Sequence, residues 1–154
     1  MEFYRNIGLC FIFILVALTG CNSSVTGQVT STEKIMTSNV VVDKIEIYHF
    51  HATNQCASCI AVGKLAEETV NTYFSDELKS GKIVFSHINA ELPENRELAE
   101  KYGVTSASLW IGTYSSLGFN KELNTNVWYK INNKNDYMNY LKEIIKKRLS
   151  GDLS

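Results

Sequence analysis

The sequence has a single proline, only four cysteines and no excess of positive charge among its 154 residues. So little proline excludes a collagen-like or proline-rich disordered chain, and four cysteines are too few for a disulfide-dense miniprotein. Fifteen Lys and Arg residues against sixteen Asp and Glu give a net charge of −1, which argues against nucleic acid as a partner. What remains is an ordinary globular composition, with 45% hydrophobic residues and enough length for one domain.

The longest apolar run, from Ile7 to Leu18, is too short to cross a bilayer as a helix, which takes about 20 residues. Arg5 precedes this run, and Leu18-Thr19-Gly20-Cys21 ends it. A positive start, a short apolar core and small residues before a cleavage site are typical of a secretory signal. The motif ending in Cys21 resembles the bacterial lipobox. That resemblance implies cleavage before Cys21, lipid on its sulfur, and a protein anchored outside the cytoplasm on the cell membrane or the outer membrane.

We therefore expect four segments along the chain. A signal peptide spans residues 1–20, the lipidated Cys21 and a flexible tether span 21–42, a folded domain spans 43–149, and a tail spans 150–154. The tether is rich in Ser, Thr and Asn, and its last residues, Val40 to Val42, are a candidate edge strand.

Cysteine usage points to one pair of thiols. Cys10 leaves with the signal peptide and Cys21 carries the lipid, so that only Cys56 and Cys59 remain. In an exported protein, where disulfides persist, these two can pair only with each other.

The pattern of the domain predicts alternating strands and helices. The domain begins with a strand of β-branched and aromatic residues, and a loop follows it. Cys56 then opens a long helix, which ends at Gly81. We expect strands at 45–51, 82–89, 108–111 and 127–131, and helices at 56–80, 94–102 and 136–149, with a long polar loop at 113–126. The order β-α-β-α-β-β-α predicts an α/β fold with a mixed central sheet flanked by helices.

Residues 43–149 resemble the thioredoxin-like superfamily. The resemblance rests on Cys56-Ala57-Ser58-Cys59 between a strand and a helix, and on Tyr102-Gly103-Val104 before the third strand. More narrowly, Phe50-His51-x-Thr53-x-x-Cys56-x-x-Cys59, with Asp76 to Gly81, is similar to a small thioredoxin-like family labelled as a nitrophenyl-compound nitroreductase subunit.

The sequence departs from the thioredoxin pattern at three places. The position of the superfamily's cis-proline, which shapes the substrate groove and keeps metals off the sulfurs, is Ser108 here. Phe50 stands where thioredoxins have a buried carboxylate for proton handling, and Gln55 stands where a Trp commonly precedes the first cysteine.

The spacing of the two cysteines predicts redox chemistry. Cysteines at i and i+3 at a helix start can form a disulfide, and the helix N-terminus favours a thiolate at the first position. Cys56 is thus the predicted nucleophile and Cys59, on the apolar face, the resolving thiol. His51 is a candidate for proton handling, because its pKa lies near neutrality. A purely structural disulfide is disfavoured, since so short a loop constrains the unfolded chain little.

A metal site is the competing interpretation. His49 and His51 share one face of a strand, and with Cys56 and Cys59 they make a set suited to Zn or Cu, as in a metallochaperone. The alternative interpretation is that His49 and His51 are packed, hydrogen-bonded residues and not ligands. We expect His87 to be structural.

Trp110 is a packing residue or part of a substrate groove, and Trp128 is expected to pack on the sheet.

The resemblance implies thiols and disulfides of exported proteins as clients and a membrane thiol-disulfide transporter as the source of electrons.

Overall fold

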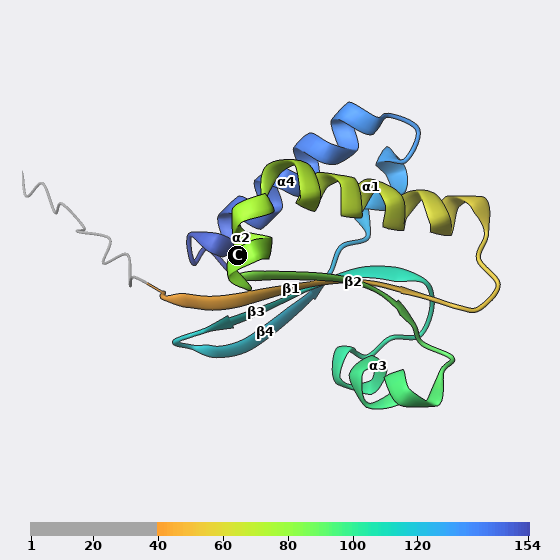
Figure 1. Cartoon of the computed structure of the whole chain (residues 1–154), viewed down its shortest axis with the longest axis horizontal. Coiled ribbons are helices and arrows are strands. Elements are labelled where there is room, and N and C mark those ends of the chain that lie inside the picture. The colour runs from red at the N-terminus through yellow and green to blue at the C-terminus, as the bar shows by residue number, and fades with distance from the viewer. Residues whose placement is uncertain (1–39) are drawn as a thin grey trace, which may run out of the picture. The chain divides into compact units, whose positions relative to one another are not determined.

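The computed structural model describes residues 40–154, so the expected signal peptide, Cys21 and most of the expected tether lie outside the described residues. One mixed sheet and its helices make up this part of the chain (Figure 1). The elements are, in chain order, β1 (Val42–His51), α1 (Ala57–Tyr73), α2 (Ser75–Ser80), β2 (Ile83–Asn89), the 3-10 helix η1 (Pro93–Asn95), α3 (Arg96–Tyr102), β3 (Ser108–Ser115), β4 (Gly118–Leu123), the 3-10 helix η2 (Asn126–Lys130) and α4 (Lys134–Leu149).

The four strands lie in the order β2-β1-β3-β4. Strand β1 pairs in parallel with β2 and antiparallel with β3, and β4 forms an antiparallel hairpin with β3. Helices α1 and α4 lie on one face of the sheet, and α3 lies on the other (Figure 1). The expected α/β fold with a mixed sheet flanked by helices is therefore confirmed.

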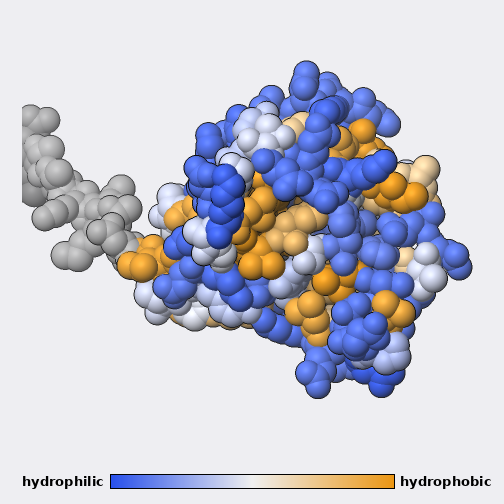
Figure 2. All heavy atoms as spheres, in the orientation of Figure 1, coloured by the Kyte–Doolittle hydropathy of each residue, from blue (hydrophilic) through white to orange (hydrophobic). Residues whose placement is uncertain are grey.

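The side chains of β1 contribute to two hydrophobic cores, one on each face of the sheet, because successive side chains of a strand point to opposite faces. Ile45 and Ile47 are buried in the core beneath α1 and α4. Tyr48 and Phe50 belong to a smaller core that includes Tyr102 of α3. On the face of the molecule shown in Figure 2, hydrophobic residues form small separate groups in a mostly hydrophilic surface.

The helix ends agree with the predicted signals, with one difference. Gly81 and Gly103 both adopt the left-handed conformation that ends a helix, with φ of 75° and 74°. The single helix expected at 56–80 is wrong, because the chain breaks at Phe74 into α1 and α2. The Phe74 side chain is buried in the core, and its backbone leaves the helical region there.

The strand expected at 127–131 is wrong. Residues 127–130 belong to η2 and Ile131 follows it, and Val127 is fully buried against the core. The fourth strand is instead β4, within the segment expected to be a long loop. A tight turn through Ser116 and Leu117 joins it to β3, and Gly118 takes a φ of 101°. Trp128 accordingly packs against the core from η2, not from a strand.

The first strand begins at Val42, and the last helix ends at Leu149. Val42, the last residue of the expected tether, already opens β1, while Val40 and Val41 precede the strand. Within residues 40–154, no helix is both long enough and apolar enough to cross a membrane.

Candidate functional site

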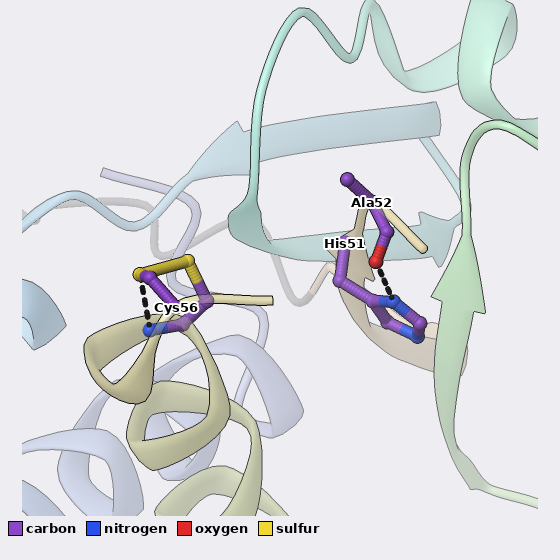
Figure 3. The surroundings of a disulfide bond; sticks show 4 residues. His51, Ala52 and Cys56 are labelled. Carbon is purple, nitrogen blue, oxygen red and sulfur yellow. Dashed lines mark hydrogen bonds between the residues drawn. A yellow bond between two sulfur atoms is a disulfide. The ribbon is translucent and has the colours of Figure 1, made fainter. Parts of the chain in front are cut away.

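Cys56 and Cys59 form a disulfide at the start of α1 (Figure 3), with their Cα atoms 5.1 Å apart. Cys56 is exposed, whereas Cys59, one turn into the helix, is partly buried. Cys56 is thus the more accessible of the two cysteines. The roles of nucleophile for Cys56 and resolving thiol for Cys59 stay a prediction.

Cys56 is the N-cap of α1. Its Sγ accepts a hydrogen bond from the Cys59 backbone N–H over 3.2 Å, and its carbonyl oxygen accepts one from the Ile60 N–H. The first N–H groups of a helix have no partner within the helix and carry its positive dipole end. Once the disulfide is reduced, the same N–H and dipole favour the thiolate form of Cys56 over the thiol.

The loop that carries Cys56 is fixed to the end of β2. The Thr53 N–H donates to the Glu91 carboxylate over 2.9 Å, and the Asn89 side-chain amide donates to the Thr53 hydroxyl over 3.0 Å. Hydrogen bonds from Thr53 lower the pKa of Glu91. These contacts join the loop before the cysteine pair to the residues at the end of β2.

His51, the candidate for proton handling, is partly buried at the end of β1. Its Nδ1 lies 2.9 Å from the carbonyl oxygen of Ala52, which can only accept, so Nδ1 carries a hydrogen and donates it. In Figure 3 the ring is turned towards this carbonyl and not towards the sulfur atoms. A role of His51 in proton transfer stays a prediction.

His49 is the histidine that lies deepest beneath α1, with only 1% of its surface exposed. Its Nδ1 lies 3.0 Å from Nδ1 of His87, its partner on β2, and its ring stacks on His51 with the ring centres 5.5 Å apart. Its Nε2 makes no hydrogen bond within the described part of the chain. Burial, with a smaller effect of His87 and His51, lowers the pKa of His49 to about 4, and the Cys59 backbone partly offsets this shift.

Sequence reasoning missed the pairing of His49 with His87. His87 was expected to be structural, yet it links His49 to Glu67 of α1, whose carboxylate lies 3.4 Å from Nε2 of His87. The signal in the sequence was the presence of a histidine on each of two strands. It becomes a contact only through the parallel register of β1 and β2, which no local pattern fixes.

Gly63 allows α1 to lie directly on this histidine pair. A Cβ atom at Gly63 would stand 2.4 Å from Nδ1 of His49 and 2.9 Å from Cε1 of His87. Both distances are far below van der Waals contact, and His49 is buried and cannot move aside.

Gly63→Ala is therefore expected to destabilise the domain by about 1–3 kcal/mol, the usual cost of overpacking. The expected sign is opposite to that of the same change at an open helix position, where alanine is favoured by about 1 kcal/mol. Chemical denaturation of the wild type and the variant measures the difference, with the exposed Lys64→Ala as the control. A Gly63→Ala protein as stable as the wild type would contradict the close packing.

A groove runs beside the site. A hollow of about 250 Å³ lies between the end of β1, at His51 and Ala52, and the loop 104–107. A second hollow, of about 470 Å³, shares four lining residues with the first and continues along η1 and α3. The groove is thus lined by the loop that precedes β3.

Ser108, the position compared with the cis-proline, is buried at the start of β3 opposite Phe50. Its hydroxyl donates to the Ser106 carbonyl oxygen over 2.9 Å and accepts from the Trp110 indole over 3.1 Å. No peptide bond in residues 40–154 is cis. Trp110 packs on the ring of Tyr102, with the ring centres 6.0 Å apart. Neither Ser108 nor Trp110 lines the groove.

The metal interpretation depends on Cys56, Cys59, His51 and His49 meeting at one point. Among residues 40–154, no group of three or more His, Cys, Asp or Glu side chains is arranged to hold a metal ion. His49 and His51 do stack, but the two sulfurs are bonded to each other. Zinc or copper binding by the reduced pair stays a prediction.

Comparison with protein-family models gives no match to this chain. Comparison with curated proteins also gives none. The geometry of the cysteine pair and its surroundings therefore carries the functional argument.

Proposed function

We propose that this protein is a membrane-anchored, extracytoplasmic thiol-disulfide oxidoreductase or electron carrier of thioredoxin-like fold. The observation that carries the proposal is the exposed Cys56 at the N-cap of α1, bonded to Cys59 one turn further on. A disulfide in which one sulfur is exposed and receives a helix N–H is suited to exchange. A bridge over a sequence separation of 3 is a poor structural staple.

The fold supports the thioredoxin-like part of the proposal. The helices and strands that form the main layers follow the expected order, and the sheet order β2-β1-β3-β4 is compatible with that fold. The cysteine pair stands at the junction of β1 and α1, where the resemblance places it.

In the reducing direction, the Cys56 thiolate attacks one sulfur of a client disulfide. The client S–S bond breaks, a Cys56–client disulfide forms, and the released client thiolate takes a proton from solvent. Cys59 then loses its proton and attacks Cys56, which breaks the Cys56–client bond and releases the second client thiol. Two electrons pass from the cysteine pair to the client. The same steps in reverse oxidise a client dithiol.

The proposal predicts that Cys56 reacts faster than Cys59 with iodoacetamide at neutral pH in the reduced protein. Cys56 is exposed and receives the helix N–H, whereas Cys59 is partly buried. The rates are measured by mass spectrometry on the variants Cys56→Ser and Cys59→Ser, each with a single thiol in the folded domain.

Equal rates in the two variants, or a faster Cys59, would contradict the assignment of the nucleophile. Metal analysis of the same reduced wild-type sample tests the competing function. One zinc or copper ion per protein, lost in both variants, would favour a metal-binding protein.

The partners in this proposal are exported proteins with thiols or disulfides. Electrons would come from a membrane thiol-disulfide transporter, as the resemblance implies. The groove that starts at His51 and Ala52 is the candidate surface for a client segment, because it lies beside the loop that leads to Cys56. Protein disulfides need such a surface if the exchange is to be selective.

The membrane anchor rests on Cys21, which lies outside the described residues. Cys21→Ser is expected to leave the protein without lipid, either soluble or with its signal peptide uncleaved. Mass spectrometry of the mature N-terminus and fractionation of membranes measure both outcomes. A wild-type protein that is cleaved at another site, with Cys21 unmodified, would contradict the anchor.

A further inference from the structure

Helix α3 covers only one end of the sheet face that lies opposite α1 and α4 (Figure 1). At the other end, towards the turn between β3 and β4, no helix of the described residues lies over this face (Figure 1). We call this uncovered part the open face. Its side chains come from β1, β3, β4 and the end of α3, and they are Lys44, Lys101, Trp110, Tyr114, Phe119 and Lys121.

Lysine ammonium groups stand over the aromatic rings of the open face. The Nζ atom of Lys44 lies 4.5 Å from the centre of the Tyr114 ring, its partner on β3. The Nζ atom of Lys101 lies 4.3 Å from the centre of the Phe119 ring. Lys121 reaches the neighbouring tryptophan ring in the same way, at 5.7 Å. These cation–π contacts hold three positive charges close to the sheet.

The open face has an excess of positive charge. Glu46 lies beneath it, only 6% exposed, and its oxygens are 2.7 Å from Nζ of Lys44 and 3.8 Å from Nζ of Lys101. The ammonium group of Lys121 donates to the carbonyl oxygen of Lys101 over 2.6 Å. Glu122, the next residue of β4, pairs with α4 on the other face. Three ammonium groups thus surround one buried carboxylate.

Exposed apolar side chains border these lysines. Phe119 is 38% exposed and Leu123, further along β4, is 45% exposed. Leu117, in the turn between β3 and β4, is 73% exposed, and Val41 is 61% exposed. The Ser116 N–H donates to the Val41 carbonyl oxygen over 2.8 Å, which places the start of the described chain beside that turn. Lysines, aromatic rings and apolar side chains on one surface suit a membrane–water interface.

The chain that carries the proposed lipid anchor enters the domain at this end. The sequence predicts that residues 22–39 are a tether, and a flexible chain of that length spans about 25 Å on average. Cys56 follows the opposite end of β1, a strand of 10 residues, and is therefore about 30 Å away. An anchor on Cys21 would thus hold the Val41 end of the domain near the membrane.

We propose that the open face docks on an anionic lipid bilayer and turns the cysteine pair away from the membrane. The proposal rests on the membrane anchor proposed above. The three ammonium groups pair with lipid phosphates, while Leu117, Phe119 and Leu123 enter the headgroup region. One lysine near an anionic surface strengthens binding about fivefold. Because the anchor already holds the domain at the surface, such a weak contact is enough to set its orientation.

Lysine labelling on vesicles tests the docking. The mature protein is reconstituted in vesicles of phosphatidylcholine and in vesicles that contain equal amounts of phosphatidylcholine and phosphatidylglycerol. A brief treatment with N-succinimidyl acetate, followed by mass spectrometry, gives the labelling rate of each lysine. On the anionic vesicles, Lys44, Lys101 and Lys121 should react at least about threefold more slowly, as three such charges favour the docked state. Lys64, exposed on α1, should react equally on both.

Two exposed substitutions test the open face itself. Lys121→Gln should lower the ratio of docked to undocked protein about fivefold, and Leu117→Ser should lower it as well. Both should raise the labelling rate of Lys44 on anionic vesicles towards its rate on phosphatidylcholine. Lys64→Gln and Tyr129→Ser are the matched controls, because they remove a lysine from α1 and an exposed ring from η2.

The outcomes separate the docking from the anchor. A lipidated protein whose lysines react alike on both kinds of vesicle would overturn the docking alone. The same result with a dimeric mass in detergent would assign the open face to a second copy of the chain. A mature protein without lipid on Cys21 would overturn the anchor, and the docking too if that protein does not float with anionic vesicles. Flotation of the lipid-free protein, weakened by Lys121→Gln, would support the docking and overturn the anchor.

Discussion

Replacement of Cys56 by serine is expected to reduce disulfide reductase activity by at least about 100-fold, because a serine hydroxyl does not ionise at neutral pH and forms no disulfide. Cys59→Ser is expected to lose turnover for a different reason. Its Cys56 still receives the helix N–H and attacks the client, but the folded domain has no second thiol to release the resulting mixed disulfide. Both variants should therefore lose most of the turnover, and they should differ in the species that accumulates when no other thiol is present.

Insulin reduction with dithiothreitol measures the turnover. The trapped species is measured separately, by non-reducing mass spectrometry of prereduced protein mixed with insulin after dithiothreitol has been removed, because dithiothreitol itself cleaves a mixed disulfide. A mixed disulfide should appear with Cys59→Ser and not with Cys56→Ser. Ser58→Ala is the control, because it lies between the cysteines and leaves both sulfurs in place. Full activity in Cys56→Ser, or a mixed disulfide formed on Cys59 instead, would contradict the mechanism.

The second large effect is expected at Glu46, on the face of the sheet opposite the cysteine site. This carboxylate is 6% exposed and accepts hydrogen bonds from Lys44, Tyr102 and Tyr114 over 2.7, 2.8 and 3.1 Å. Gly112 makes room for this contact, since a Cβ there would overlap the Tyr102 hydroxyl. Burial alone would raise the pKa of Glu46, but the three hydrogen bonds outweigh it and lower the pKa.

Glu46→Ala is expected to destabilise the domain by about 2–4 kcal/mol, because it leaves two tyrosine hydroxyls and a lysine without their shared acceptor. The pH dependence has a definite sign. The pKa of Glu46 is lower in the folded state than its ordinary value of 4.5, so the unfolded chain takes up the proton first as the pH falls. The contribution of Glu46 is fully present above pH 4.5 and is lost as the pH falls below it.

Denaturant titrations between pH 3 and 7 measure both effects. Glu46→Gln, which keeps the size of the side chain, should lack the loss of stability that Glu46 causes below pH 4.5. Glu143→Ala is the control, since Glu143 is exposed and its pairs with Lys142 and Lys146 lie at the surface, where the expected change is within about 0.5 kcal/mol. A Glu46→Ala protein as stable as this control would show that the buried network contributes nothing.

The sequence was most informative where a local rule decides the structure. The glycines at 81 and 103 ended helices as expected, because few other residues adopt a left-handed conformation without strain. It was least informative for β4, the edge strand of the sheet, where most residues are exposed and no alternation of apolar and polar residues marks a strand. The apolar residue Val127, at the start of the segment wrongly predicted as a strand, is instead buried from a 3-10 helix.

The candidate site was predictable to the extent that it is local. Two cysteines three positions apart at a helix start are a sequence feature, and the structure places them in one disulfide. The contact of His49 with His87 and the fit of Gly63 against both rings depend on strand register and on the docking of α1. Both are properties of tertiary packing, for which adjacent residues carry no signal.

A redox titration of the Cys56–Cys59 pair tests the central claim most directly. The folded protein is equilibrated with dithiothreitol or glutathione mixtures of known potential, and the fraction of free thiols is measured by alkylation and mass spectrometry. We predict a reversible two-electron transition above about −300 mV, in the range of catalytic rather than structural disulfides. A pair that changes state only below that potential, or only when the domain unfolds, would contradict a redox-active site.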